Sequence, residues 1–228
     1  MTEDGSYPQT AAECAEVYGE LPGWTRGEIE GLTEARLDRT GPEGWAGWPP
    51  RRQVSHMAYI TTRWFMIWYG AISLPWNPFD MSQFGTFINT PQDDRRFAEA
   101  RYRDPEWLLA RLEEACAAAA DRLDDLEKNP RDDRTLLFVF PADARLGATQ
   151  GRVLDLWSRT AVCHSDGVFP DPGYPGGFRM TPLGTLRHTL WDDLIHLRSL
   201  RMHREAMGLA PVHPEAPVGG YGPAYPVR

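Results

Sequence analysis

One uninterrupted helical segment, DPEWLLARLEEACAAAADRLDDLEK at residues 104–128, most constrains the fold of this chain. Asp104 can cap the helix, Pro105 suits its first turn, and Glu106 complements the positive end of the helix dipole. The segment ends at NPRDD, because a proline cannot continue a helix. A helix of this length must bury an apolar face against other elements, and the rest of the chain must supply them.

Most other segments with regular spacing also indicate helices. We expect helices over residues 10–21, 50–72 and 149–163, and a last helix that begins near Pro182. Pro22-Gly23 should break the first helix and leave a short helical piece through GWTRGEIEGL. TLLFVF at 135–140 predicts a short strand or a buried turn, and SDGVFPDPGYPGGFRMTP at 165–182 predicts a loop. The inventory favours an all-α fold, a helical bundle.

A length of 228 residues suits one domain with elaborations. We place that domain at residues 1–210, with an elaborated insertion at about 129–181 and a tail rich in Pro and Gly at 211–228. The tail should be unneeded for the core fold. The stretch SLPWNPFDMSQFGTFINTP at 73–91 has many helix breakers and several aromatic residues, so it is a candidate lid.

Charge and cysteine content exclude several classes of protein. The formal net charge is −8 and the basic residues are dispersed, which argues against nucleic-acid binding. Three widely spaced cysteines without a CxxC motif argue against a disulfide framework and a zinc–thiolate site. We find no apolar run of membrane-spanning length and no signal-like N-terminal segment, so we expect a cytoplasmic protein.

The last predicted helix, RHTLWDDLIHLRSLRMHRE, gathers polar groups on one face. At about 100° per residue, that face carries five side chains: His188, Asp192, Ser199, His196 and His203. The arginines on the opposite side, Arg187, Arg198 and Arg201, are the better candidates for solvent. Histidines on such a face are either core or partner-contact residues, or they are metal ligands.

A metal site on this helix needs two ligands one turn apart. Asp192 can pair with His188 or with His196, whereas the two histidines lie about 12 Å apart along the axis and suit one ion poorly. A third ligand must come from another helix, and His56 is the natural candidate because Ile60 shares its face. We expect His164 and His213, which lie in loop contexts, on the surface.

Two segments carry a family resemblance. GLTEARLDRTGPEGWAGWPPRRQVSHMAYITTRWF resembles the N-terminal half of DinB-like (DinB/YfiT) proteins, and RHTLWDDLIHLRSLRMHREAMG resembles the last helix of their mycothiol-dependent branch. The resemblance implies an up-down four-helix bundle and a divalent metal ion (zinc, nickel, iron or manganese) held by His56, Asp192 and His196. Many members have a histidine where this chain has Asp192. Mycothiol is implied as a possible co-substrate.

The resemblance leaves His188 outside the ligand set, so it is a candidate pocket residue. Trp64 and Trp191 are further candidates because they fall near the predicted ligand face, and Arg63 because it lies one turn from the face of His56. The resemblance implies a metal-dependent enzyme that performs thiol transfer, isomerisation or hydrolysis on a small metabolite, for which aromatic residues of the insertion suit an apolar or aromatic substrate. A non-catalytic protein that binds or sequesters a small molecule on the same fold is the alternative. We expect a small-molecule partner, no nucleic-acid or membrane partner, and possibly a homodimer.

Overall fold

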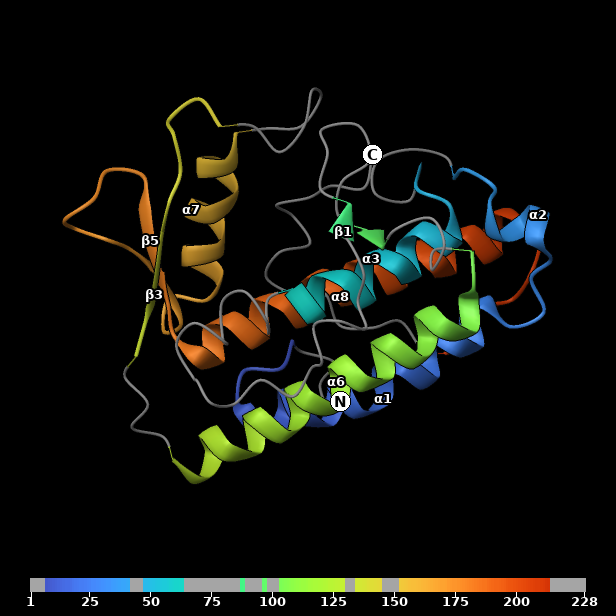
Figure 1. Cartoon of the computed structure of the whole chain (residues 1–228), viewed down its shortest axis with the longest axis horizontal. Coiled ribbons are helices and arrows are strands. Elements are labelled where there is room, and N and C mark those ends of the chain that lie inside the picture. The colour runs from blue at the N-terminus through green and yellow to red at the C-terminus, as the bar shows by residue number, and fades with distance from the viewer. Residues whose placement is uncertain are drawn as a thin grey trace.

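The computed structural model describes residues 7–41, 47–63, 87–88, 96–97, 103–129, 134–144 and 152–213, and these are mostly helical (Figure 1). The helices are α1 (Ala11–Ile29), α2 (Glu34–Leu37), α3 (Pro50–Arg63), α6 (Pro105–Lys128), α7 (Val153–Cys163) and α8 (Pro182–Ala206). The strands are β1 (Phe87–Ile88), β2 (Arg96–Phe97), β3 (Leu136–Val139), β4 (Val168–Pro170) and β5 (Gly177–Met180). No described helix is long and apolar enough to cross a membrane.

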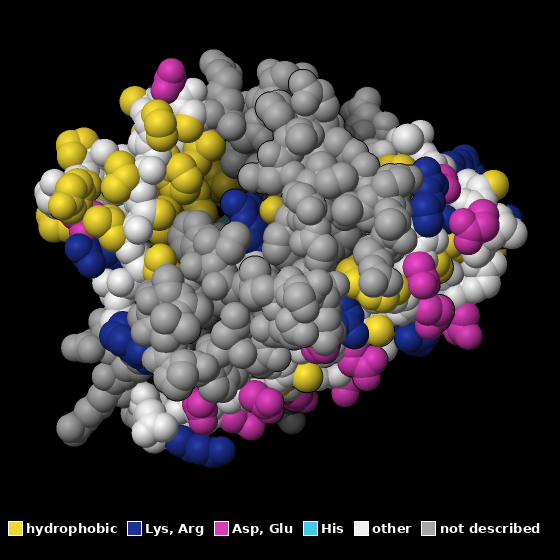
Figure 2. Space-filling model, in the orientation of Figure 1, with side chains coloured by type: hydrophobic (Ala, Val, Ile, Leu, Met, Phe, Trp, Pro, Cys, Tyr) yellow, Lys and Arg dark blue, Asp and Glu magenta, His cyan; other side chains and the backbone are white. Residues whose placement is uncertain are grey.

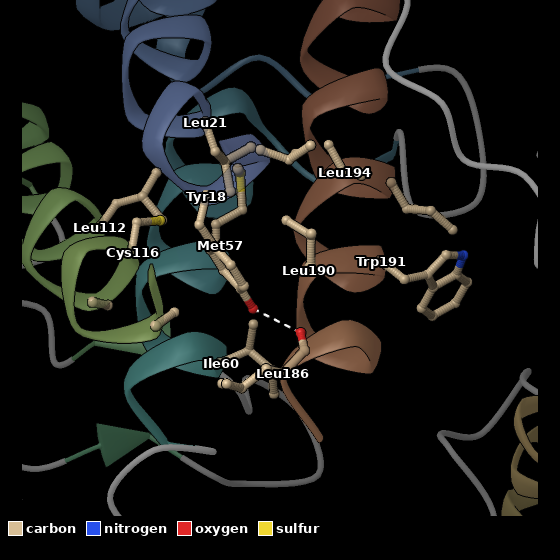
Figure 3. Packing of buried hydrophobic residues seen from close by; sticks show 14 of the residues in the cluster. Tyr18, Leu21, Met57, Ile60, Leu112, Cys116, Leu186, Leu190, Trp191 and Leu194 are labelled. Atoms are coloured by element: carbon tan, nitrogen blue, oxygen red, sulfur yellow. Dashed lines mark hydrogen bonds between the residues drawn. The ribbon is translucent and has the colours of Figure 1, made fainter. Parts of the chain in front are cut away.

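The core lies where α1, α3, α6 and α8 contact one another (Figure 1). Figure 3 shows side chains from all four helices meeting there, among them Tyr18 and Leu21 of α1, Met57 of α3, Leu112 of α6 and Leu190 of α8. The Tyr18 hydroxyl donates a hydrogen bond of 2.8 Å to the Leu186 carbonyl, which satisfies the polar end of this buried ring.

Helices α6 and α8 begin as their sequences predict. The Asp104 side chain accepts a hydrogen bond of 3.0 Å from the Trp107 N–H, and the Thr181 hydroxyl accepts one of 3.0 Å from the Gly184 N–H. The apolar face of α6 enters the core, whereas Asp and Glu side chains gather on the surface over this helix (Figure 2). The helical character of the chain is therefore confirmed.

The expected break at Pro22 is wrong, because α1 continues through this residue to Ile29. Pro22 has no N–H to donate to the carbonyl one turn earlier, which costs the helix a hydrogen bond. Both halves of α1 nevertheless bury side chains. Tyr18 and Leu21 precede the proline, and Thr25 and Ile29 follow it. A capping box between Thr10 and Glu13 also fixes the first turn.

The predicted loop at 165–182 instead contains two strands, so the fold is not purely α-helical. Strand β5 pairs antiparallel with both β3 and β4, in the order β3-β5-β4. Phe138 of β3 lies opposite Phe178 of β5, and both rings contact Trp157 of α7. The predicted insertion thus contains its own small sheet and α7, beside the start of α8 (Figure 1).

Two glycines bring this sheet onto α8. A Cβ atom on Gly184 would overlap the backbone of Gly167. The two backbone segments can approach this closely because neither residue carries a side chain. The Thr181 N–H donates to the Gly167 carbonyl at 2.8 Å, which fixes this approach at the first turn of α8.

The second long helix is described only over Pro50–Arg63, and its predicted extension to Ile72 lies outside the described residues. The candidate lid at 73–91 also lies outside them, apart from β1. Helix α7 starts at Val153 with Arg152 as its N-cap residue, somewhat later than the predicted start at 149.

Arg187 was expected in solvent, but its side chain is buried. It forms an ion pair with Asp166 and donates to the Gln9 carbonyl at 3.1 Å, while the Tyr7 hydroxyl donates to the Arg187 carbonyl. These contacts place the N-terminal segment over α8.

His164 is also buried, which corrects its predicted surface position. The centroid of its ring lies 5.5 Å from that of the Tyr7 ring.

His213 is a second correction, because it too is buried. It stacks on Trp24, with ring centroids 5.8 Å apart, and its Nε2 atom lies 3.3 Å from Oε1 of Glu28. The backbone N–H groups of Val212 and His213 also point at this oxygen, at 2.9 and 3.3 Å. The first residues of the predicted tail therefore pack on α1 over a buried carboxylate.

Candidate metal centre

Helices α3 and α8 bring His56, Asp192 and His196 together. One ligand atom from each residue can be chosen so that all three lie within 4.8 Å of one another. Nε2 of His56 is 3.0 Å from Oδ2 of Asp192, and the rings of His56 and His196 have centroids 4.4 Å apart. The two helices face each other here, so these polar side chains converge on one point from opposite sides.

The structure distinguishes the two pairings that the spacing on α8 allowed. Asp192 and His196 join His56, whereas His188 lies one turn earlier and is absent from this group. Its ring instead contacts Trp157 of the insertion, at 4.8 Å between centroids, and Trp191, at 5.7 Å. His188 therefore connects the insertion to the helix that carries the cluster.

Burial governs the electrostatics of this region. It lowers the pKa of His188 to about 4, although the nearby Asp192 acts in the opposite direction. His188 is therefore neutral at pH 7. Burial opposes ionisation of Asp192, yet the hydrogen bond from His56 and the adjacent imidazoles bring its pKa below the ordinary value. A carboxylate is accordingly present between the two histidines.

Asp193, the next residue, contacts a different residue of α3. It is fully buried and its Oδ2 atom accepts a hydrogen bond of 2.7 Å from the Thr61 hydroxyl. Burial raises the pKa of this carboxyl group well above its ordinary value. The two neighbouring aspartates thus have different surroundings, and Asp192 alone joins the histidines.

Trp48 and Gln53 surround the cluster, and the sequence analysis named neither as a site residue. The Trp48 ring is stacked on His196 at 5.5 Å and lies edge-on to His56 at 5.2 Å. Oε1 of Gln53 is hydrogen-bonded to Nδ1 of His196. Gln53 precedes His56 by three residues on α3, a spacing that places both side chains on one helical face and could have identified it.

The predicted pocket residues have different positions. Trp191 is buried beside His188, as its position on α8 suggests. Arg63 ends α3 and lies over the Tyr59 ring, 5.9 Å from its centroid. Trp64 lies outside the described residues. Hydrophobic side chains also gather over α7 and the small sheet (Figure 2), where Val139 and Tyr174 are exposed.

Comparison with protein families gives a match to the mycothiol maleylpyruvate isomerase N-terminal domain, over residues 25–161. The matched region contains α3 with His56, and it ends before α8 with Asp192 and His196. Neither the comparison with curated proteins nor that with solved structures gives a match. The family match covers more than half of the chain, and the chain therefore belongs to the mycothiol maleylpyruvate isomerase N-terminal domain family, within the DinB-like superfamily.

Proposed function

We propose that this protein is a metal-dependent enzyme that activates a small thiol, with mycothiol as the co-substrate. The observation that carries the proposal is the convergence of His56, Asp192 and His196 in a member of a mycothiol-related family. His56 and Asp192 are separated by 136 residues in the sequence, so their contact is a product of the tertiary fold.

The donor set fits a divalent ion. Two imidazoles and one carboxylate suit zinc, nickel, iron or manganese, and three protein ligands leave a position open for a further group. An ion held there would lower the pKa of a thiol at the open position and so supply a nucleophile at neutral pH. We further propose that α1, α3, α6 and α8 form the family's up-down four-helix bundle, in a domain that extends past the expected boundary at residue 210 to include His213, which packs on α1.

The chain's own residues would bind and orient the reactants. His56 and His196 are almost completely buried, so they present their nitrogens in surroundings with little competing water. The aromatic residues of the insertion, in contact with His188, favour a small apolar or aromatic substrate on that side. Thiol transfer and isomerisation both fit this arrangement.

Metal analysis tests the proposal first. Protein purified without a polyhistidine tag should contain about one equivalent of a divalent ion, or take one up after dialysis, and His196→Ala should lose it. Thr62→Val is the matched control, because Thr62 is buried on α3 and its hydroxyl has no hydrogen-bond partner among the described residues. Addition of mycothiol to cobalt-loaded protein should then change the visible absorption spectrum.

Two results would separate this function from its alternatives. Wild-type protein that takes up no zinc, nickel, iron or manganese refutes the enzymatic proposal. Protein that binds metal while mycothiol leaves the cobalt spectrum unchanged refutes the thiol-activating role.

A further inference from the structure

The backbone carbonyl of Trp48 joins α3 to α8 beside the metal centre. It accepts a hydrogen bond of 3.0 Å from Nε2 of Gln53 and one of 2.7 Å from Nε2 of His203. A carbonyl oxygen has two lone pairs, so these two donors use its full capacity. Gln53 and His203 are both buried, and water cannot readily replace either bond.

This carbonyl determines which way the Gln53 amide points. Its NH2 group must face the Trp48 oxygen, because the reverse orientation would set two acceptors against each other. Oε1 therefore faces His196, where it is hydrogen-bonded to Nδ1. An amide oxygen only accepts, so Nδ1 of His196 must carry the hydrogen.

A neutral imidazole with a hydrogen on Nδ1 has its lone pair on Nε2, the nitrogen that can then bind a metal ion. We propose that Gln53 is a positioning residue that holds His196 in this tautomer and so prepares it as a metal ligand. The stacked Trp48 ring limits rotation of the imidazole, with ring planes inclined by 17°. This inference rests on the proposed metal centre and extends it to the residues that orient one ligand.

The tautomer can be measured without any metal. In metal-free protein labelled with ¹⁵N at histidine, two-bond and three-bond couplings distinguish a hydrogen on Nδ1 from one on Nε2, and His196→Ala assigns the signal. The wild-type ring should carry its hydrogen on Nδ1. Gln53→Met, which has a similar length but no amide, should lose this preference. A wild-type ring protonated on Nε2 alone overturns the inference, whatever the variant does.

Metal affinity supplies the second readout. Gln53→Met should weaken cobalt binding about 10- to 100-fold, the usual effect of removing a group that orients a metal ligand. Gln53→Glu retains an oxygen that can accept from Nδ1 but sets its second oxygen against the Trp48 carbonyl, so it should recover only part of the loss. Thr62→Val, a buried change on the same helix, should leave both the affinity and the tautomer unchanged.

The outcomes for the two proposals are separable. If the wild-type protein binds cobalt and Gln53→Met has the same His196 tautomer and the same cobalt affinity, the proposed role of Gln53 is overturned while the metal centre stands. Wild-type protein that shows the Nδ1 hydrogen but binds no metal refutes the proposed function, while the hydrogen-bond assignment survives.

Discussion

Residues 211–213 cover a buried carboxylate, and we predict that a chain ending at Ala210 is markedly less stable than one ending at His213. Glu28 is fully buried and has contacts with the Val212 N–H, the His213 N–H, His213 Nε2 and Arg204 Nε. The shorter chain loses the first three and keeps the Arg204 contact of 3.4 Å.

The magnitude follows from the loss of partners around a buried charge. Hydrogen bonds to charged groups contribute about 1.5–3 kcal/mol each, and a buried carboxylate stripped of partners costs about 3–5 kcal/mol. Water entering the vacated space replaces part of this, so we expect a loss of about 3 kcal/mol. For a chain of this length, that corresponds to a fall in Tm of about 6–12 °C.

Urea unfolding of the two truncated chains measures the difference directly, because both lack the same residues beyond His213. The same two truncated chains carrying Glu28→Gln provide the control. The neutral amide should reduce the difference in their free energies of unfolding, since no charge is then left without partners. Equal stabilities for the two truncated chains, within about 0.5 kcal/mol, would refute the reasoning and restore the expectation that the whole tail is unneeded.

Three further predictions concern other parts of the chain. Burial, with Arg187 nearby, lowers the pKa of His164 to about 3, so the unfolded chain gains a proton below about pH 6.5 that the folded chain does not. Lowering the pH from 6.5 to 4.5 should therefore cost the wild type about 2 kcal/mol more than His164→Gln, by urea unfolding; equal pH slopes contradict this. Gly184→Ala should lower Tm strongly because its Cβ would overlap Gly167, whereas Gly19→Ala, with open space around it, should raise Tm slightly; similar shifts would disprove the close approach. His188→Ala should retain bound metal in elemental analysis, and loss of the metal would show that the ligand pairing on α8 is wrong.

Local signals were sufficient for the long helices and insufficient for the elements that depend on distant partners. Asp104 and Pro105 mark the start of α6, and Pro182 marks that of α8, because capping and proline preferences act within one turn. TLLFVF was recognised as a possible strand and contains β3, but β4 and β5 were missed because they are short and β5 pairs with a strand that precedes it by about forty residues. The predicted helix break at Pro22 was wrong for the same reason, since the packing of α1 on both sides of the proline outweighs the lost hydrogen bond.

The same contrast holds at the candidate site. The spacing on α8 proposed Asp192 with either neighbouring histidine, and only the position of α3 shows that His196 is the one near His56. The spacing of Gln53 and His56 could have indicated that Gln53 lies near the cluster, but its orientation depends on the main-chain oxygen of Trp48, a group that no pattern of side chains can indicate. His164 and His213 were expected on the surface because the residues that cover them come from the other end of the chain.

The separation of 136 residues between His56 and Asp192 also orders events during synthesis. At about 5–20 residues per second, a ribosome takes roughly 7–27 s to advance from the first of these residues to the second. During that interval, α1, α3 and, once it has been made, α6 have no α8 to cover them, and Met57 and Tyr18 lack some of the neighbours that bury them in the finished fold. A nascent chain at this stage exposes apolar surface and offers a lone imidazole from the cluster. The burial of this apolar surface and the assembly of the His56, Asp192 and His196 cluster therefore both depend on the same late event, the arrival of α8.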